Sequence, residues 1–107
     1  MNSNERIRVY IVEDHPIYTE GLVIQLDRQN DMHVVGNSES VDHALTNIPE
    51  LKPDIVITDL SFKEGISGIE LIKGLKRDHP ELLFLALSMH EEPSYIERAI
   101  RAGANGY

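Results

Sequence analysis

Side chains that could bind a metal ion or act as a nucleophile lie at the ends of three apolar runs. Glu13 and Asp14 follow residues 7–12, Asp59 follows residues 55–58, and Ser88 follows residues 82–87. Clustered carboxylates need a cation to offset their repulsion, and an all-oxygen ligand set suits Mg²⁺. A carboxylate beside Mg²⁺ can attack a phosphoryl group, while a hydroxyl can hydrogen-bond a phosphoryl oxygen. Together these residues indicate phosphoryl-transfer chemistry.

Each of these residues also has a plainer interpretation when it is taken alone. An Asp at a strand end, such as Asp59, is most often a turn or cap residue. Glu13 and Asp14 could form a solvated loop, and Ser88 could simply lead into a helix. Their joint occurrence at three strand ends favours the functional interpretation, because ligands of such sheets bind at the carboxyl ends of the strands.

The elements that must position these residues alternate along the chain. Apolar, β-rich runs predict strands at 7–12, 32–36, 55–58 and 82–87. Helices are predicted at 16–28 and at 69–78. A short helix capped by Ser40 or Asp42 should run to residue 48 and end at Pro49. Pro93 and Ser94 should start the last helix, which Gly103 caps. A further strand should begin at 106–107. This order predicts an α/β domain with a parallel sheet and helices on both faces.

Composition limits the function classes that remain. A chain of 107 residues is one small domain, and its net charge of −8 argues against binding nucleic acid by itself. There is no cysteine, so disulfides and thiolate metal sites are excluded, and a reducing compartment such as the cytoplasm is expected. No apolar run approaches the ~18 residues of a membrane span.

Four segments of the chain resemble the receiver domains of two-component response regulators. They read VEDHP at 12–16, PDIVITDLS at 53–61, LSMH at 87–90 and AGANGY at 102–107. The sequences of the first and third segments are most similar to those of the NarL/FixJ subgroup. The resemblance covers nearly the whole chain and implies a flavodoxin-like (CheY-like) fold, a doubly wound parallel five-stranded sheet with strand order 2-1-3-4-5.

The resemblance implies a role for each matched residue. Asp59 would be the phospho-acceptor, and Mg²⁺ would be held by Glu13, Asp14, Asp59 and the backbone carbonyl of Ser61. Ser88 would move to the phosphoryl group as Tyr107 swings inward, and His90 and Ser61 would tune the lifetime of that group. His15 is not expected to bind Mg²⁺, which prefers oxygen, although it could perturb the adjacent acidic pair.

Partners also follow from the resemblance. A sensor histidine kinase or a small phosphodonor would supply the phosphoryl group, and the chain could form a homodimer. DNA would be bound only through a separate C-terminal helix-turn-helix domain, and no membrane contact is expected. The chain would then be a switch that promotes only its own phosphorylation and dephosphorylation, and not an enzyme in the usual sense.

Two features depart from the family pattern. Lys63 replaces the usual proline four residues after the acceptor, and Gly68 lies nine residues after Asp59 instead of eight. The chain also ends at Tyr107, before the family's lysine, so we expect a receiver cut short before its last strand and helix. Ile100 and the fourth strand would then face water or another molecule.

Three alternatives remain at this point. A receiver-like docking module that is never phosphorylated is disfavoured by the intact Glu13, Asp14, Asp59 and Ser88. A phosphatase or transferase of similar topology would usually carry a second Asp where this chain has Ser61. A flavin carrier would need a phosphate-binding loop, and none is convincing.

Overall fold

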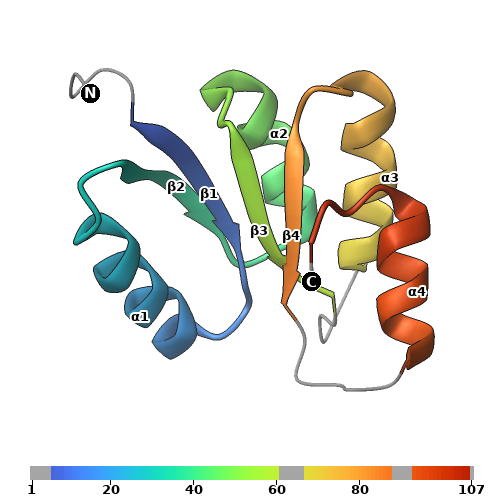
Figure 1. Cartoon of the computed structure of the whole chain (residues 1–107), viewed down its shortest axis with the longest axis horizontal. Coiled ribbons are helices and arrows are strands. Elements are labelled where there is room, and N and C mark those ends of the chain that lie inside the picture. The colour runs from blue at the N-terminus through green and yellow to red at the C-terminus, as the bar shows by residue number, and fades with distance from the viewer. Residues whose placement is uncertain (1–5, 61–66, 88–92, 107) are drawn as a thin grey trace.

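The computed structural model describes residues 6–60, 67–87 and 93–106, which form a parallel sheet flanked by helices. Four strands, β1 (Ile7–Val12), β2 (Met32–Ser38), β3 (Ile55–Asp59) and β4 (Leu83–Leu87), lie in the order β2-β1-β3-β4 (Figure 1). All three strand pairs are parallel. The intervening helices are α1 (Pro16–Asp27), α2 (Val41–Leu51), α3 (Gly68–Asp78) and α4 (Pro93–Ala102). The predicted alternation and the order of the first four strands are confirmed.

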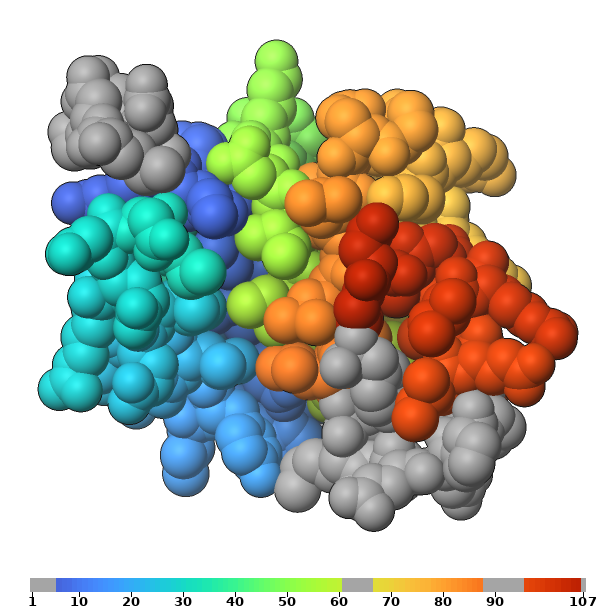
Figure 2. Space-filling view, viewed as in Figure 1, coloured from blue at the N-terminus to red at the C-terminus, as the bar shows by residue number. Residues whose placement is uncertain are grey.

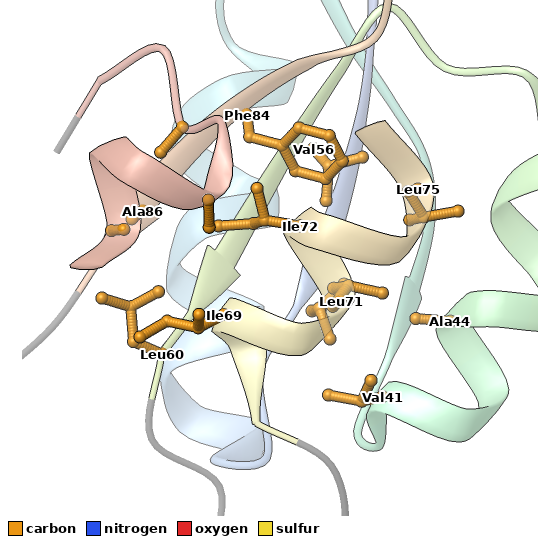
Figure 3. Packing of buried hydrophobic residues seen from close by; sticks show 14 of the residues in the cluster. Val41, Ala44, Val56, Leu60, Ile69, Leu71, Ile72, Leu75, Phe84 and Ala86 are labelled. Atoms are coloured by element: carbon orange, nitrogen blue, oxygen red, sulfur yellow. The ribbon is translucent and has the colours of Figure 1, made fainter. Parts of the chain in front are cut away.

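The sheet has a hydrophobic core on each face. Leu22, Val23 and Leu26 of α1 pack on one face, against a cluster that includes Val9, Ile11 and Ile57. The larger core lies between the other face and helices α2, α3 and α4 (Figure 3). Its members include Val56 and Phe84 from the sheet and Ile72 and Leu75 from α3. Both faces are therefore covered, which explains the continuous apolar runs of β1 and β3.

A fifth strand is only begun within the described residues. Gly106 forms an isolated parallel bridge with Leu85, and the backbone N–H of Ala86 donates to the Gly106 carbonyl at 3.0 Å. The side chain of Asn105 accepts a hydrogen bond from the backbone N–H of Phe84 at 3.0 Å. The last described residues thus lie beside β4, at the position predicted for strand five. Tyr107 lies outside the described residues.

The exposure of β4 differs in part from the prediction. In the space-filling view β4, in orange, remains visible beside the dark-red C-terminal segment (Figure 2). Leu83 is 46% exposed and Ile100 of α4 is 56% exposed, as expected. Phe84 and Ala86, however, are fully buried, so the expectation that residues 83–87 as a whole face water is wrong. Alternate residues of a strand point to opposite faces, and these two face the larger core.

The end of α2 also differs from the prediction. Pro49 was expected to close this helix, but it lies inside it, and the helix continues to Leu51. Leu51, which follows Pro49, is partly buried and packs against the core. This packing offsets part of the ~3 kcal/mol cost of an internal proline. Of the two candidate caps at the start, Ser40 is the N-cap, and its hydroxyl accepts the backbone N–H of His43.

Candidate functional site

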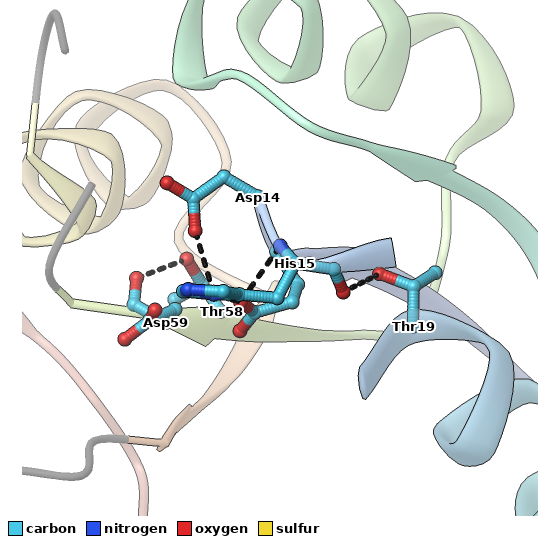
Figure 4. A network of polar contacts seen from close by, with 6 residues as sticks. Asp14, His15, Thr19, Thr58 and Asp59 are labelled. Carbon is cyan, nitrogen blue, oxygen red and sulfur yellow. Dashed lines mark hydrogen bonds and ion pairs between the residues drawn. The ribbon is translucent and has the colours of Figure 1, made fainter. Parts of the chain in front are cut away.

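Parallel pairing of β1 and β3 brings the acidic residues together. The register pairs Val12 with Thr58, so Glu13, which follows β1, lies beside Asp59, the last residue of β3. One ligand atom from each of Glu13, Asp14, His15 and Asp59 lies within 4.8 Å of the others. Figure 4 shows Asp14, His15 and Asp59 close together at this edge. The predicted convergence of the carboxylates of β1 and β3 is therefore observed.

Glu13 is the most buried residue of this cluster. Its side chain is buried, with 7% of the residue exposed, and its backbone N–H donates to the Ser38 carbonyl at 3.0 Å. Burial raises the pKa of Glu13 above the usual 4.5, and the nearby charge of Asp59 raises the pKa further. Hydrogen bonds from His15 partly offset this rise in the pKa. A cation at this edge would stabilise the charged form.

His15 contacts both members of the acidic pair. Its Nδ1 lies 2.5 Å from Glu13 Oε1 and 3.0 Å from Asp14 Oδ1, and its backbone N–H donates to Glu13 Oε1 at 3.1 Å. The residue occupies the N-cap position of α1, but its side chain makes no capping hydrogen bond. The suggestion that His15 could perturb the acidic pair is confirmed at Glu13, where the hydrogen bonds from His15 lower the raised pKa.

Asp59 is fixed through its backbone. Thr58 Oγ1 donates to the Asp59 carbonyl at 2.8 Å, and the Gly68 N–H donates to the Leu60 carbonyl at 3.2 Å. A Cβ atom added at Gly68 would lie 2.1 Å from the Asp59 carbonyl oxygen, so only glycine fits there. The sequence showed Gly68 only as a loop residue with an unusual spacing, and its contact with the acceptor strand was missed.

Comparison with known proteins identifies the family. Residues 9–107 match the model of the response regulator receiver domain. The chain belongs to this family. The receiver is 37% identical over 101 residues to the response regulator GacA of Pseudomonas viridiflava, covering 94% of this chain and 47% of that protein. It therefore spans about half the length of the curated relatives it matches.

Solved structures of related receivers agree with this assignment. A LuxR-family response regulator from Aurantimonas sp. superposes with a TM-score of 0.90 at 31% identity, covering 95% of this chain and 72% of that one. The signal receiver domain of NarL from Mycobacterium tuberculosis gives a TM-score of 0.89 at 29% identity, covering 95% and 82%. These relatives confirm the fold of the described sheet and the NarL-like subgroup that the motifs indicated.

Several predicted site residues of this receiver lie outside the described residues. They are Ser61, Ser88, His90 and Tyr107, and their roles stay predictions. The structure does show that β4 ends at Leu87, which pairs with Asp59 of β3. In the part of the receiver that the structure describes, no helix is long and apolar enough to cross a membrane.

The donor set at the carboxyl edge fits a divalent cation. Three carboxylates lie close enough to share one ion, and Glu13 is poorly solvated, so its charge needs compensation from within the site. Mg²⁺ takes one or two carboxylates and completes its shell with water and phosphoryl oxygens. The receiver therefore has an acidic cluster that could bind a metal ion.

Proposed function

We propose that this receiver is a phosphorylation switch whose acceptor is the carboxylate of Asp59. The observation that carries the proposal is the cluster itself, in which a strand-end Asp lies beside Glu13 and Asp14 in a chain of the receiver family. Asp59 is the last residue of β3 and pairs with Leu87 of β4, and Gly68 and Thr58 restrain its backbone. A restrained nucleophile loses little entropy on reaction.

The residues of this chain would share the chemistry as follows. Glu13, Asp14 and the Ser61 carbonyl, with Asp59, would hold Mg²⁺, which neutralises charge on the incoming phosphoryl group. An Asp59 carboxylate oxygen attacks phosphorus, a P–O bond forms, and the bond to the donor's leaving group breaks. The product is an acyl phosphate. The Ser88 hydroxyl would hydrogen-bond a phosphoryl oxygen, and Tyr107 would follow its movement.

Partners of the switch are proposed by analogy with the relatives. A sensor histidine kinase would donate the phosphoryl group, and a small phosphodonor could replace it in vitro. The curated relatives are about twice as long as this chain. One of them, the DNA-binding transcriptional activator DevR/DosR of Mycobacterium tuberculosis, is 35% identical over 101 residues. We propose that DNA is bound through a separate domain, because this chain carries a net charge of −8.

Mass measurement after treatment with a small phosphodonor tests the proposal. The wild-type chain should gain one phosphoryl group with Mg²⁺ and none when the cation is chelated. Asp59→Asn should abolish the gain, whereas Asp31→Asn, which changes an exposed carboxylate outside the cluster, should not. An Asp59→Asn chain that is still fully labelled would overturn the assignment, and a wild-type chain that is never labelled would favour a docking module.

A further inference from the structure

We propose that Ser38, the last residue of β2, is a positioning residue for Glu13. Ser38 acts through its backbone carbonyl, which holds the point at which β1 ends and Glu13 leaves the sheet. The proposal rests on the proposed function in one respect, because it takes Glu13 as a ligand of Mg²⁺. Its evidence lies outside the acidic cluster, in hydrogen bonds that reach Ser38 from β1 and α2.

The contact that carries the proposal joins the ends of β1 and β2. The backbone N–H of Glu13 donates to the Ser38 carbonyl at 3.0 Å, directly after the last residue pair of the two strands, Val12 with Ser38. Glu13 follows the strand, so this hydrogen bond restrains the backbone from which its carboxylate reaches the site. A displacement of the Ser38 carbonyl therefore displaces the carboxylate of Glu13.

The buried side chain of Ser38 is held from two sides. Its hydroxyl is hydrogen-bonded to the Tyr10 hydroxyl of β1 and lies 2.7 Å from Nδ1 of His43 in α2. The Asn47 side chain of α2 donates in turn to the Tyr10 hydroxyl at 2.9 Å. With Nδ1 of His43 as the acceptor, each hydroxyl in this chain accepts one hydrogen bond and donates the next. A buried polar network that is satisfied in this way restrains its members.

A register shift in β2 brings Ser38 to this position. The strand contains one extra residue, Val35, because the pairing shifts between Val9 and Tyr10 of β1. A shift of one residue moves side chains to the opposite face of a strand. Uninterrupted pairing would therefore place Asn37, and not Ser38, on the face of Tyr10. Bulges of this kind often re-aim a side chain next to an active site.

A purely structural role for Ser38 is the alternative, because buried hydrogen bonds also stabilise a fold. The two roles differ in what the loss of the Ser38 hydroxyl changes. A structural role predicts lower stability with an unchanged affinity of the folded chain for Mg²⁺. A positioning role predicts a weaker Mg²⁺ affinity as well. It also predicts, without any metal, that the Glu13 amide is less protected from hydrogen exchange.

Titration of the melting temperature with Mg²⁺ measures this affinity, since an ion that binds only the folded state stabilises it by mass action. Residues that orient a metal ligand typically contribute 10–100-fold to metal affinity. Ser38→Ala should lower the Mg²⁺ affinity about tenfold, at the low end of that range, because the carbonyl itself remains. Ser38→Thr keeps the hydroxyl and should restore most of the affinity. His43→Leu removes one of the two contacts of that hydroxyl and should lower the affinity less than Ser38→Ala does.

Asp27→Ala is the matched control. Oδ1 of Asp27 accepts the backbone N–H of Val34 at 3.0 Å, so this change also removes a side-chain contact with β2, but four residues before Ser38. It should leave the Mg²⁺ affinity unchanged. Hydrogen exchange followed by NMR without divalent cations provides the second measurement. Relative to the other amides of β1, the Glu13 amide should exchange faster in Ser38→Ala and at the wild-type rate in Asp27→Ala.

Two results would overturn the proposal. One is a wild-type Mg²⁺ affinity in both Ser38→Ala and His43→Leu; if Ser38→Ala does not fold, His43→Leu alone decides. The other is an equal loss of affinity in Asp27→Ala, which would show that the general stability of β2 sets the affinity. Failure of the proposed function would look different, because the variants would still differ in Mg²⁺ affinity while Asp59 of the wild type gained no phosphoryl group. A wild-type chain that does not respond to Mg²⁺ would reject Glu13 as a ligand and this proposal with it.

Discussion

At the scale of a single residue, the charged form of Glu13 that a cation site needs is also the form that destabilises the fold. Its carboxyl group is buried beside Asp59, and both burial and that charge raise its pKa above 4.5. The folded chain therefore holds the Glu13 proton more tightly than the unfolded chain does. The resulting stabilisation is present below pH 4.5 and is lost as the pH rises through the folded-state pKa.

A first prediction follows for Glu13→Gln, which removes this titration. The free energy of unfolding of the wild type, relative to Glu13→Gln, should fall as the pH rises from about 4.5 towards neutrality, because the wild type must ionise a buried group. Urea unfolding at several pH values without divalent cations measures this difference. Millimolar Mg²⁺ should reduce the fall. A difference that does not vary with pH would show that Glu13 ionises without penalty.

Gly68 supports a second prediction at the residue scale. A methyl group there would lie 2.1 Å from the Asp59 carbonyl oxygen and 2.9 Å from the Leu60 Cα, so Gly68→Ala must displace the backbone of the acceptor. Overpacking of this kind typically costs about 1–3 kcal/mol. Gly68→Ala should therefore lower the melting temperature and slow the phosphorylation of Asp59.

Gly74 provides the matched control for that change. It lies in the same helix, α3, and nothing lies within 4 Å of the Cβ position. Gly74→Ala should stabilise the helix by roughly 0.5–1 kcal/mol and leave phosphorylation unchanged. Equal behaviour of the two variants would show that the close approach at Gly68 does not matter in solution.

At the scale of the elements, the sequence predicted the strands better than the ends of the helices. Strands β1 and β3 are covered on both faces, so their buried residues form continuous apolar runs that are visible without a structure. The extent of α2 was missed because the rule for Pro49 is local, whereas the helix end depends on the packing of Ile48 and Leu51.

The candidate site also has some features that the sequence pattern predicts and others that depend on tertiary packing. The meeting of Glu13, Asp14 and Asp59 follows from parallel strand order, which the sequence pattern supplies. The contacts of His15 and the close approach of Gly68 depend on the direction of side chains and on the path of the loop. These are tertiary properties, and spacing along the chain does not contain them.

Tyr10 links three elements and supports a third prediction. Its hydroxyl is buried in β1, forms a hydrogen bond with Ser38 of β2, and accepts one from the Asn47 side chain of α2 at 2.9 Å. Tyr10→Phe removes both hydrogen bonds, while Ser38 keeps its contact with His43 at 2.7 Å and Asn47 is half-buried. The expected loss is therefore about 0.5–1.5 kcal/mol per hydrogen bond. Urea unfolding should show the loss. Tyr18→Phe, at a side chain that is 49% exposed, should change stability by less than about 0.5 kcal/mol.

At the scale of the whole molecule, charge links metal binding to folding. The chain carries a net charge of −8, and at least three carboxylates meet at one edge of the sheet. An ion that binds only the folded state stabilises it by mass action, by about 2.7 kcal/mol when its concentration is 100 times the dissociation constant. In a chain of this size each kcal/mol raises the melting temperature by roughly 4 °C.

Mg²⁺ at millimolar concentration should therefore raise the melting temperature of the wild-type chain by several degrees. NaCl at the same ionic strength should have a smaller effect, because general screening does not require the cluster. Asp14→Ala should remove most of the rise in melting temperature that Mg²⁺ causes. Glu81→Gln, which changes an exposed side chain outside the cluster, should retain this rise. Calorimetric melting of the three chains in both salts makes the comparison. If Mg²⁺ and NaCl act equally on the wild type, the effect is screening of the net charge, and the carboxyl edge of the sheet does not bind the ion.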